Sequence, residues 1–95
     1  IYPSDLEAVL RQHPAVDDVS VVGVPSEEWG ETPVAFVVRK ADDATDADTL
    51  RQWANAQMGK TQRISGLRFI AELPRSAIGK VLKRELRDAW AAAPG

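Results

Sequence analysis

The chain has 95 residues, a net charge of −2 and no cysteine, which is enough for one small domain and excludes a disulfide framework or a thiolate metal site. Its hydrophobic fraction of 44% and charged fraction of 27% are ordinary for a soluble globular protein, and no apolar run approaches the roughly 20 residues of a membrane span. We therefore expect a cytoplasmic protein with no transmembrane segment, and the slightly acidic balance argues against generic nucleic-acid binding.

The first predicted element is a helix that starts near Ser4. Ser4 and Glu7 have the spacing of a capping box, in which Ser4 caps free amide groups and Glu7 reaches back to it. Leu6 and Leu10 follow at helical spacing, and Pro14 ends the helix.

Two strands are predicted next, over residues 16–24 and 34–40. Both segments are rich in valine, which prefers the strand conformation. A long polar connection over residues 25–33, which contains Trp29, separates them. We expect the two strands to pair as a hairpin across this connection.

A second helix is predicted after an acidic turn over residues 41–48. Thr45 or Asp46 can provide its N-cap, and Gly59 fits its C-terminal end. Its apolar face is formed by Leu50, Trp53, Ala54 and Met58.

The last third of the chain predicts a strand over residues 67–71, a loop over residues 74–80 and a helix from Val81 toward Ala92. Leu82, Leu86 and Trp90 line one side of that helix. The complete order αββαβα predicts an α+β domain, with a three-stranded sheet packed by helices over residues 1–95. Both ends resemble cuts in a longer chain, so we expect one domain of a larger protein.

The loop over residues 74–80 reads PRSAIGK and has the most specific local pattern. Gly79 permits unusual backbone angles, and Lys80 then projects a point charge that suits a phosphate or a carboxylate. The loop is no P-loop, because Pro74 and Val81 stand where that motif needs glycine and Ser or Thr. Taken alone, the pattern fits an exposed lysine at a helix start somewhat better than a functional site.

Positive charge is concentrated around this loop. Residues 60–87 contain two acidic residues and eight basic ones, namely Lys60, Arg63, Arg68, Arg75, Lys80, Lys83, Arg84 and Arg87. A basic third within an acidic chain indicates a local anionic partner. Lys83, Arg84 and Arg87 form one helix face that either contacts another domain or is solvated.

Short blocks in chain order carry a resemblance that covers residues 1 to about 88. They are IYP (1–3), Glu7, HPAV (13–16), VVGVP (21–25), WGE (29–31), AFVV (35–38), ELPR (72–75), GK (79–80) and RELR (84–87). This series resembles the C-terminal domain of adenylate-forming enzymes, a family that includes acyl- and aryl-CoA synthetases, luciferases and peptide-synthetase adenylation domains. The WGE block after a valine-rich strand is more similar to the CoA ligase branch.

The resemblance implies a mobile lid domain in a two-step reaction. A fatty or aromatic carboxylate attacks the α-phosphate of ATP to give an acyl-adenylate and pyrophosphate, and the thiol of CoA then displaces AMP after the domain rotates. Lys80 matches the catalytic lysine of the first step, where a cation between two anions lowers the electrostatic cost of their approach. Gly79 would let the loop reach the ATP and adenylate site.

The resemblance also implies CoA contacts at Trp29, Gly30 and Arg63. Trp29 either stacks on the CoA nucleotide or folds over the sheet edge, and Arg63 either contacts the CoA phosphates or is solvated. Many relatives have a proline where Thr61 follows Lys60, so the chain departs from the family pattern just before Arg63. We expect the loops near Trp29 and Lys80 to lie on different faces.

Most of the catalytic machinery is expected elsewhere. The resemblance implies a large N-terminal domain that holds the acyl pocket, the ATP loops, most of the Mg²⁺ site and the hinge, and without it we expect the domain to be inactive. No metal-ligand spacing occurs in this chain. Two alternatives remain open: an adenylation domain that passes the acyl group to a carrier protein, and a non-enzymatic anion-binding module.

Four other residues are interpreted as structural and not as catalytic. Trp53, Met58 and Trp90 fall at helical core spacing and are interpreted as packing residues. His13 lies before Pro14 at a helix end, where a hydrogen-bond donor suits exposed carbonyl groups.

Overall fold

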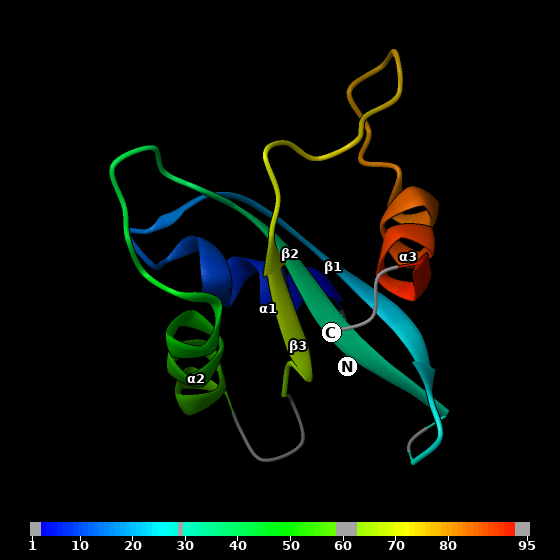
Figure 1. Ribbon diagram of the computed structural model, residues 1–95, viewed down its shortest axis with the longest axis horizontal. Helices are drawn as coiled ribbons and strands as arrows, with labels where there is room; N and C mark the ends of the chain where they lie inside the picture. Colours follow the sequence, from blue (N-terminus) through cyan, green and yellow to red (C-terminus); the bar gives the residue numbers. More distant parts are fainter. Residues whose placement is uncertain (1–2, 29, 59–62, 93–95) are drawn as a thin grey trace.

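The computed structural model describes residues 3–28, 30–58 and 63–92 (Figure 1). The elements in chain order are α1 (Pro3–Arg11), β1 (Val16–Ser26), β2 (Gly30–Arg39), α2 (Ala47–Gln57), β3 (Gly66–Phe69) and α3 (Lys83–Ala92). The predicted α+β class, the three-stranded sheet and the order αββαβα are confirmed. In these residue ranges, no helix has the length and apolar character needed to cross a membrane.

The sheet has the order β1-β2-β3 and is mixed. β1 and β2 form the predicted antiparallel hairpin, whereas β3 pairs with β2 in parallel. The prediction of a long connection over residues 25–33 is wrong, because β1 and β2 stay paired as far as Ser26 and Gly30. Pro25 is compatible with this pairing because β1 is an edge strand, where the missing N–H costs no ladder hydrogen bond.

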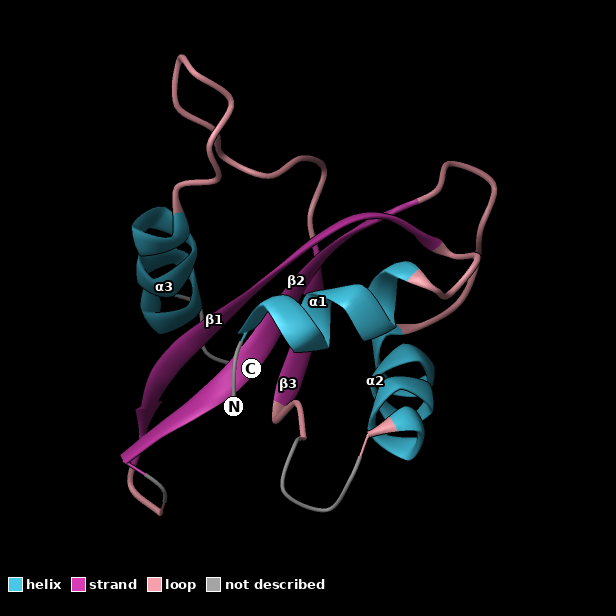
Figure 2. Cartoon of the chain, turned by 180° about the vertical axis from the view of Figure 1, so that it is seen from behind, coloured by secondary structure: helices cyan, strands magenta, loops and turns pink. Residues whose placement is uncertain are grey.

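Buried side chains of the strands alternate between the two faces of the sheet, as the two-residue period of a strand requires. Helices α1 and α2 cover one face, and Figure 2 shows α1 crossing in front of the strands. The core on that face contains Leu6, Leu10, Val19, Val21, Ala35, Val37, Leu50, Ala54, Ile64 and Leu67. Helix α3 covers the other face, where its Leu86 packs in one core with Leu73 and with Val22, Val24, Val34 and Phe36 of the strands. Trp53, Met58 and Trp90 pack against these cores, which confirms their interpretation as packing residues.

The side chain of Glu7 is hydrogen-bonded to strand β1 and not to the start of its own helix. Its Oε2 accepts a hydrogen bond from the backbone N–H of Val21 (2.8 Å) and lies 3.2 Å from Nζ of Lys83. The predicted capping box is therefore wrong: α1 begins at Pro3, so Ser4 already lies inside the helix. The Glu7 carboxylate binds the edge of β1, and not the start of α1, because leaving the partly buried N–H of Val21 unpaired would be costly.

Cationic side chains cover the carbonyl groups of the same outer edge of β1. They donate in three pairs: Arg11 to Val19 (3.3 Å), Lys83 to Val21 (3.0 Å) and Arg87 to Gly23 (3.1 Å). Lys83 and Arg87 were expected either to contact another domain or to be solvated, but both bind their own sheet. Arg84, from the same predicted basic face, is exposed.

The helix ends differ in detail from the prediction. Asp46 is the N-cap of α2, as predicted, and its Oδ1 accepts a hydrogen bond from the backbone N–H of Thr49 (2.7 Å). Gly59, the predicted C-terminal residue of that helix, lies outside the described residues. The Nδ1 of His13, expected to be a donor, accepts a hydrogen bond from the backbone N–H of Ala15 (3.0 Å).

Candidate functional site

Residues 75–81 form a short hairpin that projects beyond the sheet (Figure 1, upper yellow to orange loop). Arg75 and Val81 form an antiparallel bridge at its base, and the N–H of Leu82 donates to the carbonyl of Pro74 at 2.9 Å. The prediction that α3 starts at Val81 is therefore wrong, and the helix starts at Lys83. Val81 is instead used to close the loop.

Backbone hydrogen bonds fix the shape of this hairpin. The N–H of Gly79 donates to the carbonyl of Ser76 (2.9 Å), and the N–H of Ser76 donates to the carbonyl of Lys80 (2.9 Å). The Ser76 hydroxyl oxygen accepts from the N–H of Lys80 at 3.3 Å. Gly79 has φ +85°, which is typical of the glycine that closes a three-residue hairpin loop. The loop is thus a defined turn that carries Lys80 on its returning side.

The tip of the hairpin is open to solvent. Gly79 and Lys80 are exposed, and Ile78 is 88% exposed, the one large hydrophobic residue that is so exposed in the described part of the chain. Within the described ranges, the Lys80 ammonium has no ion-pair partner. A cation that is held by a defined turn, and that no described residue of the domain pairs with, can bind an anion supplied from outside the domain.

Arg75 joins the hairpin to the sheet. Its Nη1 donates to the carbonyl of Gly79 (2.7 Å), and its Nη2 donates to Oδ2 of Asp18 in β1 (2.6 Å). Arg75 was predicted only as part of the loop pattern, the ELPR block and the basic set around the loop, and Asp18 was not predicted as its partner. A hairpin closed at Gly79 would have indicated that Arg75 lies at its base, but no local signal links residues that are 57 positions apart.

The predicted CoA contacts lie at the other end of the sheet. Gly30 begins β2 with φ +77° and pairs with Ser26, and Arg63 is exposed in the connection before β3. This connection is tied to the start of β2, since the N–H of Ser65 donates to the carbonyl of Pro33 at 2.9 Å. Gly30 and Arg63 therefore share one end of the molecule, which Figure 1 shows opposite the Lys80 hairpin. Trp29, the third predicted CoA contact, lies outside the described residues.

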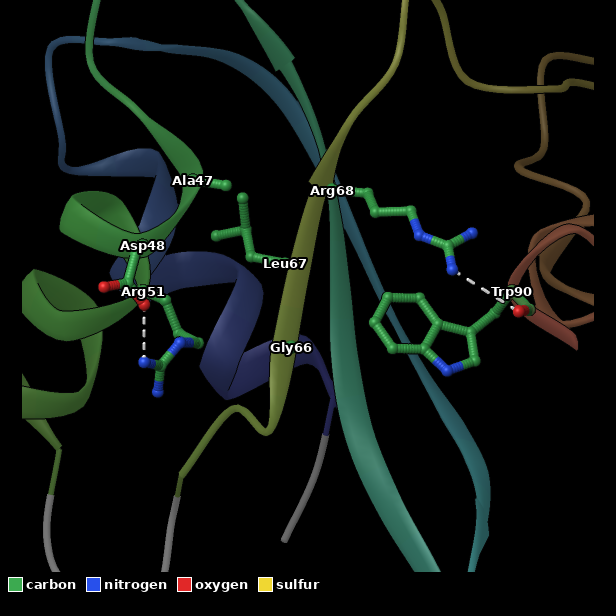
Figure 3. Close-up of a pocket in the computed structure, with 7 residues that line it drawn as sticks. All are labelled: Ala47, Asp48, Arg51, Gly66, Leu67, Arg68 and Trp90. Atoms are coloured by element: carbon green, nitrogen blue, oxygen red, sulfur yellow. Dashed lines mark hydrogen bonds and ion pairs between the residues drawn. The ribbon is translucent and has the colours of Figure 1, made fainter. Parts of the chain in front are cut away.

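A hollow of about 290 Å³ lies beside β3 and contains none of the predicted site residues (Figure 3). It is lined by Ala47, Asp48, Arg51, Gly66, Leu67, Arg68 and Trp90. Its charged groups already have partners, because Arg51 pairs with Asp48 at 2.7 Å and Arg68 donates to the carbonyls of Ala89 and Trp90. We assign no ligand to it. Among the described residues, no cluster of three or more His, Asp or Glu side chains could hold a metal ion.

Comparison with known proteins identifies the family of the chain. Residues 5–80 match the family of AMP-binding enzyme C-terminal domains, and the chain belongs to that family. It is 40% identical over 87 residues to 2-succinylbenzoate–CoA ligase of Geobacillus kaustophilus, a match that covers 92% of this chain and 18% of that protein. It is also 40% identical over 90 residues to 4-coumarate–CoA ligase 2 of Oryza sativa subsp. japonica, which covers 95% and 16%.

Solved structures of similar fold include an ATP-bound protein and an amide bond synthetase. ATP-bound MatB of Rhodopseudomonas palustris matches with a TM-score of 0.88 and 30% identity, over 95% of this chain and 18% of that one. The amide bond synthetase McbA of Marinactinospora thermotolerans matches with the same TM-score, identity and coverage. The chain thus spans less than a fifth of the length of each of these proteins.

Proposed function

We propose that the chain is the C-terminal domain of a longer, AMP-forming acid–CoA ligase, and that Lys80 serves its adenylation step. The observation that carries the proposal is the Lys80 ammonium, which has no ion-pair partner among the described residues and lies on a defined hairpin that projects from the domain. Support comes from the family match and from the relatives, which are named CoA ligases. Those relatives extend far beyond the match, so we assign the acyl pocket, the ATP loops and the Mg²⁺ site to a larger N-terminal domain.

In the proposed first step, a carboxylate oxygen of a fatty or aromatic acid forms a bond to the α-phosphorus of ATP. The bond from that phosphorus to the β-phosphate oxygen breaks, and pyrophosphate leaves with the electron pair. Both reactants are anions, so their approach is opposed by charge repulsion. The Lys80 ammonium lies between them, stabilises the charge that develops on the phosphoryl oxygens and orients the two groups.

In the proposed second step, the CoA thiol attacks the acyl carbonyl and AMP leaves. Gly30 and Arg63 would face CoA in this step, together with Trp29. This assignment is supported by the position of Gly30 and Arg63 at one end of the sheet, well away from Lys80. After rotation, the domain can therefore present a different end in each half-reaction. We place the reaction in the cytoplasm.

The proposal is tested by carboxylate-dependent exchange of pyrophosphate into ATP, measured on the longer protein with a panel of acids. We expect exchange in the wild type and a fall of at least about 100-fold in Lys80→Ala, because the variant loses a preorganised charge at the transition state. Thioester formation from a supplied acyl-adenylate should be largely retained. Lys40→Ala, which removes another exposed lysine, is the matched control and should retain exchange.

Each rival function predicts a different result. An adenylation domain that serves a carrier protein would show exchange but would transfer the acyl group to a phosphopantetheine arm and not to free CoA. An anion-binding module would show no exchange with any acid. Equal loss of both half-reactions in Lys80→Ala would contradict the assigned role of Lys80.

A further inference from the structure

We propose that Arg75 is a positioning residue, which fixes the direction of the Lys80 hairpin by joining it to Asp18 of the sheet. This inference rests on the proposed adenylation role of Lys80. The Arg75 guanidinium lies between two acceptors, the carbonyl of Gly79 at 2.7 Å and Oδ2 of Asp18 at 2.6 Å. One acceptor belongs to the hairpin and the other to β1, so the side chain connects two parts of the fold.

The contact with Gly79 acts on the peptide group that immediately precedes Lys80. Because a peptide group is planar, a hydrogen bond that fixes the carbonyl of Gly79 also fixes the N–Cα bond of Lys80. Ser76 binds the N–H and the carbonyl of Lys80 within the hairpin. Ser76 therefore determines the shape of the hairpin, whereas Arg75 determines how that shape is oriented relative to the sheet.

The Asp18 carboxylate is itself held in place. The register of β1 shifts between Val16 and Asp18, and bulges of this kind re-aim a side chain beside functional sites. The other carboxylate oxygen, Oδ1, accepts a hydrogen bond from the N–H of Val19 (2.9 Å) and lies 3.7 Å from Nη2 of Arg11. Arg75 thus binds an acceptor that β1 and α1 have already oriented.

A purely stabilising role explains this arrangement less well. The side chains of Arg75 and Asp18 are 43% and 30% exposed, and ion pairs at such exposure contribute little to folding stability. The hairpin tip beyond them is exposed. The main effect of the pair is therefore on orientation. Lysine is a poor substitute at this position, because the planar guanidinium fork can donate to two acceptors in a fixed geometry.

The first measurement is the amide order parameter of Gly79 and Lys80 from ¹⁵N relaxation of the 95-residue chain. We expect values near 0.85 in the wild type and below about 0.6 in Arg75→Gln and in Asp18→Asn. Asp17→Asn is the matched control, since it removes the same charge from the neighbouring exposed residue and should leave the order parameters unchanged. Wild-type order in Arg75→Gln would overturn the proposal, whatever the enzyme does.

The second measurement is adenylation kinetics of the longer protein. We expect Arg75→Gln and Asp18→Asn each to lower the kcat of pyrophosphate exchange by about tenfold to 100-fold, with less than about a twofold change in the KM for ATP. The double variant should be no worse than Arg75→Gln, because both changes break one connection. Arg75→Lys should recover only part of the rate, and acyl transfer from a supplied acyl-adenylate should be unaffected.

The outcomes separate this inference from the proposed function. If Arg75→Gln raises the KM for ATP while Asp18→Asn has no effect, Arg75 contacts the nucleotide directly and the positioning role is wrong. If the wild type shows no exchange with any acid, the proposed function fails and the catalytic consequence fails with it. The order parameters would then still report whether Arg75 orients the hairpin.

Discussion

The indole ring of Trp90 lies against the backbone of Gly66. A Cβ atom built at Gly66 would be 2.5 Å from Cη2 of Trp90, and Figure 3 shows the indole directed from α3 toward β3. Phe36 meets the ring edge-on, with 6.1 Å between the ring centroids, and the Arg68 guanidinium stacks over it at 4.2 Å. The last turn of α3 is therefore held to the sheet by one aromatic side chain that requires a glycine beneath it.

Gly66→Ala is expected to lower the free energy of unfolding by about 1–3 kcal/mol, because the added methyl group forces Trp90 out of its place. Urea denaturation followed by tryptophan fluorescence measures the change. The same substitution in a Trp90→Phe background should cost less, since the smaller ring leaves room for the methyl group. An equal cost in both backgrounds would show that the contact with Trp90 is not the cause.

Glu7→Ala is expected to lower the free energy of unfolding by about 2 kcal/mol, because the N–H of Val21 and the Lys83 ammonium both lose a charged partner. Glu7→Gln should cost less, since its amide oxygen can still accept from Val21. Asp5→Ala changes an exposed acid in the same helix and serves as the control. The assignment is contradicted if Glu7→Ala and Asp5→Ala have the same small effect in urea denaturation.

Gly79→Ala is expected to cost about 1–2 kcal/mol of stability or to displace the hairpin, because φ is +85° at this position. Among the described residues, nothing lies within 4 Å of the added Cβ, so the cost comes from the backbone and not from a clash. Gly79→Asn should be milder, since asparagine tolerates left-handed angles. Amide chemical shifts of Ser76 and Lys80 report whether the turn persists, and unchanged shifts with no loss of stability would contradict the assignment.

Asp46 should make folding stability depend on pH below about 4. The hydrogen bond from the backbone N–H of Thr49 lowers the pKa of Asp46 below its ordinary value of 3.8. The carboxylate therefore contributes its full stabilisation above the unfolded-state pKa and loses it as the pH falls through the lower, folded-state pKa. Thermal unfolding between pH 5 and about 2.5 should show a smaller decline in Tm for Asp46→Asn, which keeps the cap without the titration. Identical declines in wild type and Asp46→Asn would refute this origin.

The element order was predictable because its signals are local. Leu6 and Leu10 repeat with the period of a helix, valines mark the two hairpin strands, and Asp46 precedes α2 as a capping residue should. The length of the β1–β2 pairing was not predictable, because proline is typical of turns. Pro25 fits within a strand only because β1 lies at the edge of the sheet. The parallel placement of β3 depends equally on the folded sheet.

The candidate site was predictable only in part, for a similar reason. Gly79 and Lys80 are adjacent in the sequence, so the local pattern and the family resemblance identified them together. Asp18 reaches Arg75 only after β1 bends at its bulge and the segment after β3 returns to that end of the sheet. Contacts between side chains so distant in sequence follow from the assembled fold and have no periodic signature.

The side chains along the outer edge of β1 also limit how copies of the domain can associate. A valine-rich strand with free backbone groups on its edge can pair with the same strand of a second molecule and start aggregation. Here, Arg11, Lys83 and Arg87 occupy carbonyls along the edge, and Glu7 occupies the N–H of Val21. Lys83 and Arg87, which belong to the predicted basic face, thus protect the edge of β1 against pairing with another strand. Neutralising both residues would expose this edge to strand addition.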